Sequence, residues 1–325
     1  MCSSDLFTVT RLEAGQKAEK FVKKALPQAP LGYIYKAFRK KDIKRNGHWI
    51  HKDEVLAEGD VVRIYVSDQQ LADFAKPRPA EKKPFSYPIV YEDENVLIVN
   101  KPKGVLVYGD QTGSRLTLGN AVLNYLYFKG EYDPAHSSFT PSPAHRLDRN
   151  TSGLICYGKT DAALKELTDL FKERTQVEKR YEALVVGEIA SPGEVDIPLK
   201  KDPEEGRVYL STLEEGGKSA LTRYRPLKRY MGYTLVEVEL VTGRTHQIRA
   251  HMAAIHHPVV GDNKYGDFAD DRKWKKKGLS SQFLHASDLY FKEVGGVLSP
   301  LKGKHFHAEL PKDLAALLAT LSLKN

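Results

Sequence analysis

Residues 145–154 read HRLDRNTSGL, and this segment places one carboxylate, Asp148, between two arginines. Flanking cations favour the ionised form of a carboxylate, which a nucleophile or general base requires. The polar, glycine-containing sequence predicts a loop that leads into the apolar run LICYG at 154–158. For an isolated aspartate, however, capping a turn or pairing with Arg146 or Arg149 is the commoner role. The segment alone therefore does not assign a function.

Four further segments follow in a fixed order, and each combines apolar, strand-like residues with conspicuous polar side chains. They are VLIVNKPKGVLV (96–107), VEKRYEALVVGEI (177–189), LVTGRTHQIRAHMAAIHHPVVGDNKYG (240–266) and FLHASDL (283–289). With HRLDRNTSGL, they resemble the successive motifs of the RluA-type RNA pseudouridine synthases. This resemblance implies an isomerase that converts uridine in ribosomal or transfer RNA to pseudouridine.

The resemblance also implies roles for individual side chains. Asp148 corresponds to the catalytic aspartate, and Arg249 to an arginine that pairs with it. Tyr181 would lie against the target base and could accept the proton from carbon 5. Arg146 would enter the RNA helix where the base has left, and Arg244 would bind a phosphate. Without the surrounding motif, an ordinary core aromatic of a strand would be the commoner role for Tyr181.

A helix near 245–256 is expected to carry Arg249, with Thr245 as its N-cap. His145, His246 and His251 look at first like metal ligands, but their contexts favour hydrogen bonding and packing. We therefore expect no metal. The isomerisation conserves atoms and exchanges no electrons, so no cofactor is expected either, and neither a P-loop nor a dinucleotide-binding glycine motif is present.

The first 66 residues form a basic segment, with 13 Lys and Arg against 8 Asp and Glu. Helical spacing around Phe21 and again at 31–41, an Asn46-Gly47 turn and a closing strand resemble the αL-motif (S4-like) RNA-binding module. Six basic residues of this segment are predicted RNA contacts: Lys36, Arg39, Lys40, Lys41, Lys44 and Arg45. A solvated helix face is the alternative explanation for such a charge run.

The chain is predicted to divide into an RNA-binding domain at 1–66, a semi-extended linker at 67–84 and a catalytic domain at 85–325. In the catalytic domain we expect a hairpin with its turn at 92–95, and a mixed, mainly antiparallel sheet with flanking helices, which is an α+β fold. The individual elements are expected as helices near 117–128 and 161–174 and strands at 181–189, 220–227 and 233–241.

The net charge of +8 agrees with a polyanionic partner such as RNA. The two cysteines are far apart and suggest no disulfide framework, and no apolar stretch has the length of a membrane span. We expect a cytoplasmic protein that is a monomer without an obligatory protein partner. Two other functions stay open: a catalytically inactive RNA-binding or RNA-folding protein, and a uridine-specific N-glycosylase, although glycosidases usually need a second carboxylate.

The sequence departs from the family pattern in three places. Asn150 stands where an acidic residue is usual, Gly109 replaces a polar residue, and the segment 291–311 follows the pattern only loosely. These differences bear on the choice of RNA substrate and leave the expected reaction unchanged.

Overall fold

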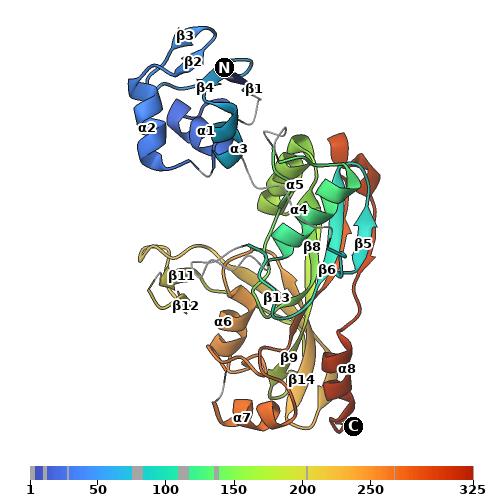
Figure 1. The fold of residues 1–325 in the computed structure, drawn as a ribbon. Coiled ribbons are helices and arrows are strands. Elements are labelled where there is room, and N and C mark those ends of the chain that lie inside the picture. Colours follow the sequence, from blue (N-terminus) through green and yellow to red (C-terminus); the bar gives the residue numbers. More distant parts are fainter. Residues whose placement is uncertain are drawn as a thin grey trace. The chain divides into compact units, whose positions relative to one another are not determined.

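The computed structural model describes residues 4–9, 13–27, 29–74, 83–108, 117–134, 139–202, 204–266 and 268–324. The chain forms two compact units (Figure 1). Residues 1–85 and 122–140 make up the first unit, and residues 86–121 and 141–325 the second. Gly109, one of the departures from the family pattern, lies outside the described residues.

The first unit contains a four-stranded antiparallel sheet. Across the sheet the strands follow the order β1 (Ser4–Thr8), β4 (Val61–Tyr65), β2 (Ile43–Arg45) and β3 (His48–Trp49). The Asn46-Gly47 turn joins β2 to β3, and both of its residues have positive φ, 50° and 87°. This is the backbone of the two-residue hairpin turns that Asn-Gly favours. The predicted turn and closing strand are confirmed.

Two helices, α1 (Ala18–Ala25) and α2 (Leu31–Arg39), confirm the helices predicted for this unit. Phe21 and Ile34 are buried with strand residues in one apolar core. These helices therefore gain their stability from one buried face, as short helices generally do.

The expected semi-extended linker begins instead with a helix, α3 (Asp68–Phe74). The backbone N–H of Gln70 donates to Ser67 Oγ, and the N–H of Ser67 donates to Gln70 Oε1, both at 3.2 Å. This reciprocal pair is a capping box, which satisfies free donors at a helix start. Leu71 and Phe74 pack against the core of the unit and hold the helix there. Residues 75–82 of the expected linker lie outside the described residues.

The second unit is built on a ten-stranded sheet, which confirms the mixed and mainly antiparallel α+β architecture. Its main path runs β10 (Gly193–Asp196), β13 (Leu221–Tyr230), β14 (Tyr233–Leu240), β9 (Val177–Val186), β15 (Leu284–Phe291), β8 (Ser152–Gly158), β6 (Val96–Lys101) and β5 (Ile89–Glu92). Outside this path, β7 (Ser142–Pro143) pairs with β8 and β16 (His305–His307) with β15. A separate two-stranded ribbon consists of β11 (Leu199–Asp202) and β12 (Arg207–Leu210).

One pairing in the large sheet is parallel. His285 of β15 lies opposite Ser152 of β8, and Ala286 opposite Gly153. Gly153 has a φ of 115°, and a Cβ built on it would lie 2.1 Å from the carbonyl oxygen of Ala286. Only glycine permits this close approach of two backbones.

The remaining helices are α4 (Leu118–Lys129), α5 (Asp161–Glu173), α6 (Gln247–Ala254), α7 (Phe268–Lys276), the 3-10 helix η1 (Gly296–Leu301) and α8 (Lys312–Ala319). The first three were predicted from the sequence. Figure 1 shows α5 beside β8, where Leu167 and Phe171 enter the same apolar cluster as Leu154. None of the helices in the described ranges combines the length and apolar composition needed to span a bilayer.

Candidate active site

The HRLDRNTSGL segment crosses from β7 to β8 as an irregular loop, as predicted. The ammonium group of Lys101, at the end of β6, fastens this loop. It donates to the carbonyl oxygens of Pro102 at 3.0 Å, Val105 at 2.9 Å and Arg149 at 3.0 Å. Burial lowers the pKa of Lys101 to about 7, while the charge of Asp148 opposes this shift. Lys101 therefore links two of the sequence motifs through backbone acceptors.

Arg249 on α6 lies between two carboxylates. Its Nη1 donates to Oδ2 of Asp148 at 3.1 Å, while Nε and Nη2 donate to the two oxygens of Asp262 at 2.6 and 2.7 Å. Burial acts against the charged guanidinium, but Asp262 and Asp148 outweigh it and raise the pKa of Arg249. The bidentate bond fixes the plane of the guanidinium, and this plane sets the position of the Asp148 carboxylate.

The start of α6 is stabilised differently from our expectation. His246, with a φ of 52°, is the N-cap residue, and Thr245 is not. The side chain of Gln247 accepts a hydrogen bond from the backbone N–H of Arg244 at 2.9 Å and another from the Thr242 hydroxyl at 2.7 Å. Thr245 was the wrong choice because the helix begins one residue later: His246 is the N-cap, and no side-chain hydrogen bond caps the first turn of α6.

Tyr181 lies on β9, opposite Val238 of β14, and its side chain is buried. Burial, together with the negative charge of Asp148, raises the pKa of Tyr181 well above its ordinary value. The phenol is therefore neutral at physiological pH. A neutral phenol presents an apolar ring face for stacking and a hydroxyl for proton transfer.

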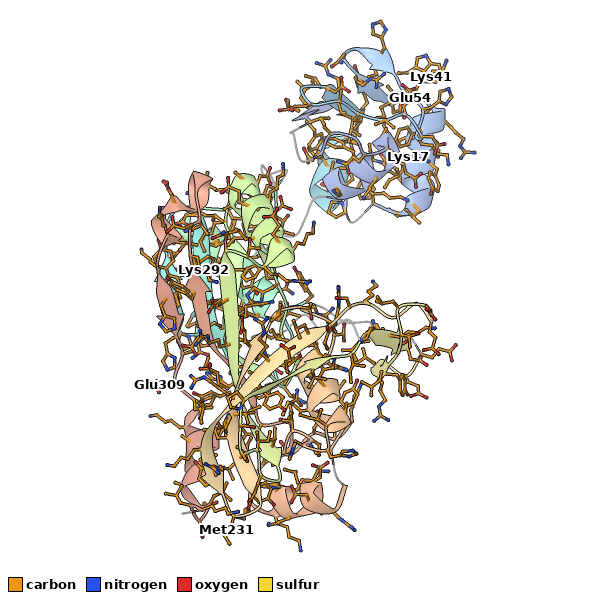
Figure 2. The ribbon with its side chains drawn as sticks, turned by 180° about the vertical axis from the view of Figure 1, so that it is seen from behind. Lys17, Lys41, Glu54, Met231, Lys292 and Glu309 are labelled. Atoms are coloured by element: carbon orange, nitrogen blue, oxygen red, sulfur yellow. The ribbon has the colours of Figure 1, made fainter. Side chains whose placement is uncertain are left out.

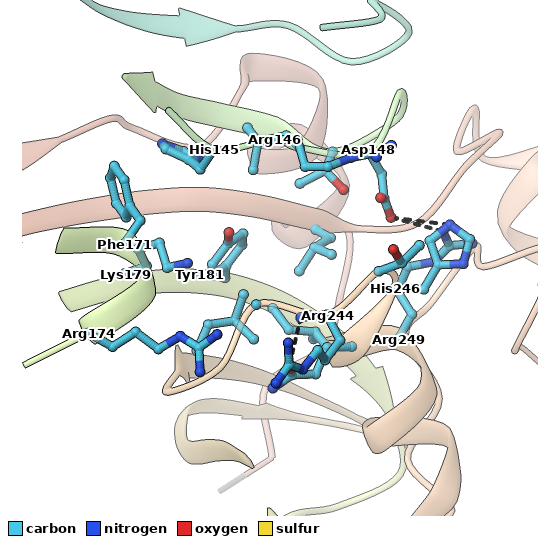
Figure 3. A pocket seen from close by; sticks show the side chains of 18 of the residues that line it. His145, Arg146, Asp148, Phe171, Arg174, Lys179, Tyr181, Arg244, His246 and Arg249 are labelled. Carbon is cyan, nitrogen blue, oxygen red and sulfur yellow. Dashed lines mark hydrogen bonds and ion pairs between the residues drawn. The ribbon is translucent and has the colours of Figure 1, made fainter. Parts of the chain in front are cut away.

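The predicted site residues meet at one cavity of about 290 Å³ (Figure 3). Asp148, Tyr181, Arg249, Arg146 and Arg244 all line it. The loop before β8, the end of α5, strand β9 and the start of α6 form its walls. Its volume lies near the lower end of ordinary ligand pockets, so it suits one nucleotide better than a long segment of chain.

The three histidines make hydrogen bonds, as expected. His145 accepts from the backbone N–H of Cys156 at 3.2 Å, Nδ1 of His246 bonds the Tyr265 hydroxyl at 2.9 Å, and His251 bonds Ile197 O at 2.8 Å. Burial lowers the pKa of His145 to about 3 and that of His246 to about 4, so both rings are neutral at pH 7. Across the described ranges, no group of three or more potential ligands is arranged to hold a metal ion.

The six basic residues predicted to bind RNA lie on the first unit, and they differ in exposure and in their contacts within that unit. Four are exposed on or just after α2: Lys36, Arg39, Lys40 and Lys41. Figure 2 shows Lys41 at the surface, with its ammonium 4.7 Å from the centre of the Trp49 ring. Arg45, by contrast, bonds Glu54 at 3.1 Å and is partly committed within the unit.

Several residues of the site were missed by sequence reasoning. Asp262, fully buried, is the second partner of Arg249, and Lys101 holds the loop that carries Asp148. Both stand inside recognised motifs, next to Gly261 and Pro102, where a charged residue in a turn is usually solvated. The cavity also contains Lys179 and Arg174, which the motif comparison left without a role.

Comparison with known proteins identifies the class to which this fold and site belong. The sequence model of the family described as RNA pseudouridylate synthase matches residues 95–254. The chain belongs to this family, the pseudouridine synthases, which isomerise uridine in RNA.

Particular relatives cover nearly the whole chain. Ribosomal large subunit pseudouridine synthase D of Zymomonas mobilis is 34% identical over 294 residues, which cover 88% of this chain and 90% of that protein. Synthase C of Escherichia coli is 32% identical to this chain, and the match covers 99% of this chain and 98% of that protein. Among solved structures, human RNA pseudouridylate synthase domain containing 4 aligns with a TM-score of 0.56 at 25% identity, over 73% of this chain and 94% of that one.

Proposed function

We propose that this protein converts particular uridines of large-subunit ribosomal RNA to pseudouridine, with Asp148 as the catalytic carboxylate. The observation that carries the assignment is the position of Asp148: it lines the cavity and is held by Arg249 at 3.1 Å. The printed names of the relatives in Zymomonas mobilis and Escherichia coli support the large ribosomal subunit as the source of the substrate. Transfer RNA is the alternative substrate.

In the reaction the bond from ribose carbon 1′ to uracil N1 breaks, and a bond from carbon 1′ to carbon 5 forms. Asp148 acts either by attacking carbon 1′ or by removing the proton from carbon 2′ to give a glycal. Either role requires the carboxylate in a fixed place. Arg249 supplies this constraint because its other face is locked to Asp262.

Tyr181 is proposed to lie against the uracil and to take part in removing the proton from carbon 5. Its raised pKa makes a free phenolate rare, so the hydroxyl must pass on its own proton as it accepts another. Asp148, released as a carboxylate when the new bond has formed, is the acceptor in the same cavity. The proton finally needed on N1 balances the one lost from carbon 5.

A base inside an RNA helix must leave the stack to reach this cavity, which costs roughly a few kcal/mol. The exposed Arg146 at the cavity is proposed to fill the vacancy, and phosphate contacts from Arg244 would offset more of the cost. The basic face of the first unit is proposed to act as an S4-like module that adds affinity largely indifferent to sequence. We further propose a monomeric, cytoplasmic enzyme.

Asp148→Asn tests the assignment. The amide can serve neither as nucleophile nor as base, so turnover should vanish, whereas folding should persist because Arg249 keeps its bidentate bond to Asp262. The test compares pseudouridine formed in a large-subunit RNA fragment and in a transfer RNA. Pseudouridine formed by Asp148→Asn above background would remove Asp148 from the mechanism.

Analysis of the wild-type product separates the other functions. Free uracil in place of pseudouridine would identify an N-glycosylase, and unchanged RNA that is nevertheless bound would identify an inactive RNA-binding protein. Mapping of pseudouridine in cellular RNA with and without the protein locates its targets.

A further inference from the structure

The lining of the cavity is strongly basic, and its basic residues other than Arg249 are called the basic wall here. Among its charged lining residues, Lys and Arg predominate, and Asp148 is the carboxylate among them. The basic residues are Arg146, Lys172, Arg174, Lys179, Arg244 and Arg249. Arg249 is already neutralised by its two carboxylates. The remaining positive charge exceeds what the reaction at Asp148 requires.

Lys179 is the most unusual member of this wall. Its side chain is 8% exposed, and its ammonium lies 5.5 Å from the centre of the Phe171 ring. A Cβ built on Gly243 would lie 3.4 Å from the same ammonium, so this glycine leaves room beside it. Within the described part of the chain, no carboxylate or carbonyl oxygen accepts a hydrogen bond from Lys179. Lys179 lines the cavity, and a poorly exposed ammonium that lacks an acceptor favours an anionic partner there.

Arg174 adds a second unsatisfied cation. It ends α5 with a φ of 63°, a conformation that costs an arginine about 1 kcal/mol or more. Its Nε is buried without a hydrogen-bond partner among the described residues. Burial and the charge of Arg244 lower the pKa of Arg174. Arg244 itself donates from Nε to the carbonyl oxygen of Ser219 at 2.9 Å, which leaves its Nη groups available to a ligand. Figure 3 shows Arg174, Lys179 and Arg244 along the same side of the cavity.

We propose that Lys179, Arg174 and Arg244 form a subsite for one phosphodiester group of the RNA, next to the uridine that enters the cavity. A phosphate has enough acceptor oxygens for two guanidinium groups and an ammonium at once, and its charge offsets the repulsion among them. The inference rests on the proposed function, since a flipped uridine carries a phosphate on each side. It adds the anchor that fixes the ribose relative to Asp148.

The subsite also explains why the Nε of Arg174 and the ammonium of Lys179 have no hydrogen-bond acceptor among the described residues. An internal carboxylate would satisfy Lys179 and stabilise the free protein, but it would repel the RNA backbone. The free protein therefore bears an electrostatic cost that substrate binding relieves. Binding energy of this kind, realised only when the nucleotide is in place, can position the ribose for reaction.

A thermodynamic cycle tests the subsite. Short RNA substrates carry either ordinary phosphodiesters or a single uncharged methylphosphonate on the 5′ or the 3′ side of the target uridine. Their affinities for the full-length protein and for Lys179→Met are measured in an Asp148→Asn background, so that the result does not depend on turnover. At one of the two linkages, replacing the phosphodiester with the uncharged methylphosphonate should weaken RNA binding roughly 10- to 100-fold in the protein that retains Lys179.

Lys179→Met should bind ordinary RNA with a comparable loss, and the methylphosphonate at that linkage should then cause little further loss. Lys179→Arg should regain most of the affinity for ordinary RNA. With Asp148 intact, Lys179→Met should raise the half-saturating RNA concentration more than it lowers the saturated rate. The proposal would be overturned if Lys179→Met bound ordinary RNA as tightly as wild type. It would also be overturned if the loss from the methylphosphonate were as large in Lys179→Met as in wild type.

Lys159 provides the matched control. It is also 8% exposed, but it is paired with Glu92 at 2.9 Å and is absent from the cavity lining. Lys159→Met should lower stability and leave the ratio of affinities for charged and uncharged linkages at its wild-type value. If Lys179→Met does not fold, the same four affinities are measured with Arg244→Gln in its place. If wild type makes no pseudouridine, the proposed function fails, while the affinity cycle still decides the subsite.

Discussion

At the scale of single residues, the two carboxylates that contact Arg249 differ in exposure and in the number of hydrogen bonds they receive from it. Asp262 is inaccessible and receives two hydrogen bonds from the guanidinium, whereas the side chain of Asp148 keeps 22% of its surface exposed and receives one. The buried carboxylate of Asp262 thus fixes the arginine, and the arginine fixes the carboxylate of Asp148. One oxygen of Asp148, Oδ2, is used in this bond, which leaves the other for the substrate.

Tyr181→Phe should keep the stacking surface and remove the hydroxyl that is proposed to transfer the proton from carbon 5. Single-turnover assays should show rearranged or covalently bound nucleotide accumulating, with product release slowed by about 100-fold or more, the usual scale for a lost general acid or base. Tyr265→Phe is a suitable comparison, because Tyr265 bonds His246 and Val208 and is not a lining residue of the cavity. A wild-type rate for Tyr181→Phe would rule out the proton-transfer role.

Lys179 should make the free energy of unfolding depend on pH. Burial and the charge of Arg174 lower the pKa of Lys179 to about 8, and Cys156 opposes this shift. The charge of Lys179 in turn helps to lower the pKa of His145. Because the folded-state pKa of Lys179 lies below the unfolded value of 10.5, the penalty is full below pH 8 and disappears as the pH rises toward 10.5.

Guanidinium unfolding of wild type and Lys179→Met measures this penalty. The free energy of unfolding of wild type should rise relative to that of Lys179→Met between about pH 8 and 10, by on the order of 3 kcal/mol. A difference that stays constant over this range would mean that the ammonium is solvated or paired, and would also weaken the phosphate subsite.

The residues that meet at the cavity could be predicted because each lies in a motif whose neighbours define it. Asp262 and Lys101 could not, because a charged residue beside glycine or proline normally faces solvent, and only the folded chain shows what it bonds. Gln247 shows the same limit: its role depends on Leu221 and Thr222, which are far from it in the sequence but near in the fold.

At the scale of elements, the approach of β8 and β15 is the most constrained contact of the sheet. Gly153→Ala would place a methyl group against the backbone of Ala286 in a conformation that alanine avoids. We expect a loss of about 4 kcal/mol in the free energy of unfolding, from strain and overpacking together. Activity should fall as well, because Asp148 lies in the loop that leads directly into β8.

Gly278→Ala separates the two contributions to that loss. Gly278 also has a positive φ, 93°, but a Cβ there meets nothing within 4 Å. Its replacement should cost only about 1 kcal/mol, from backbone conformation alone. Equal losses in chemical denaturation for the two variants would show that β8 and β15 adjust without difficulty.

Elements with strong local signals were predicted well, and those that depend on distant partners were not. The turn at Asn46-Gly47 follows from two residues. The two-residue strand β7 and the short β16 are defined only by their pairing with β8 and β15. The helix α3 is different: its Ser67–Gln70 capping box is present in the sequence, but the Pro- and Lys-rich residues that follow suggested a linker.

At the scale of the whole molecule, the basic face of the first unit should govern affinity and not chemistry. Replacing Arg39, Lys40 and Lys41 with Ala in the full chain should weaken binding to structured RNA. The slope of log affinity against log salt should fall by up to roughly 2, from roughly 0.7 for each phosphate contact with single-stranded RNA. The saturated single-turnover rate should stay near wild type.

A triple variant on the other unit controls for net charge. Lys275, Lys276 and Lys277 are exposed at the end of α7, and their replacement with Ala removes the same charge. If both triple variants shift the salt slope equally, the effect is one of overall charge, and the α2 residues would be a solvated helix face.

The parallel pairing of β8 with β15 also affects the stage of synthesis at which the chain can complete its fold. Ser152 Oγ and His285 Nδ1 are 2.9 Å apart in space, yet 133 residues separate them along the chain. Strand β9 likewise pairs with β15, so the centre of the sheet stays open until residues 284–291 have left the ribosome. Contacts of such long sequence separation form slowly, because a large loop must close first. Asp148, Tyr181 and Arg249 are all synthesised before that point, so the ability to modify RNA arises late, with one of the last strands.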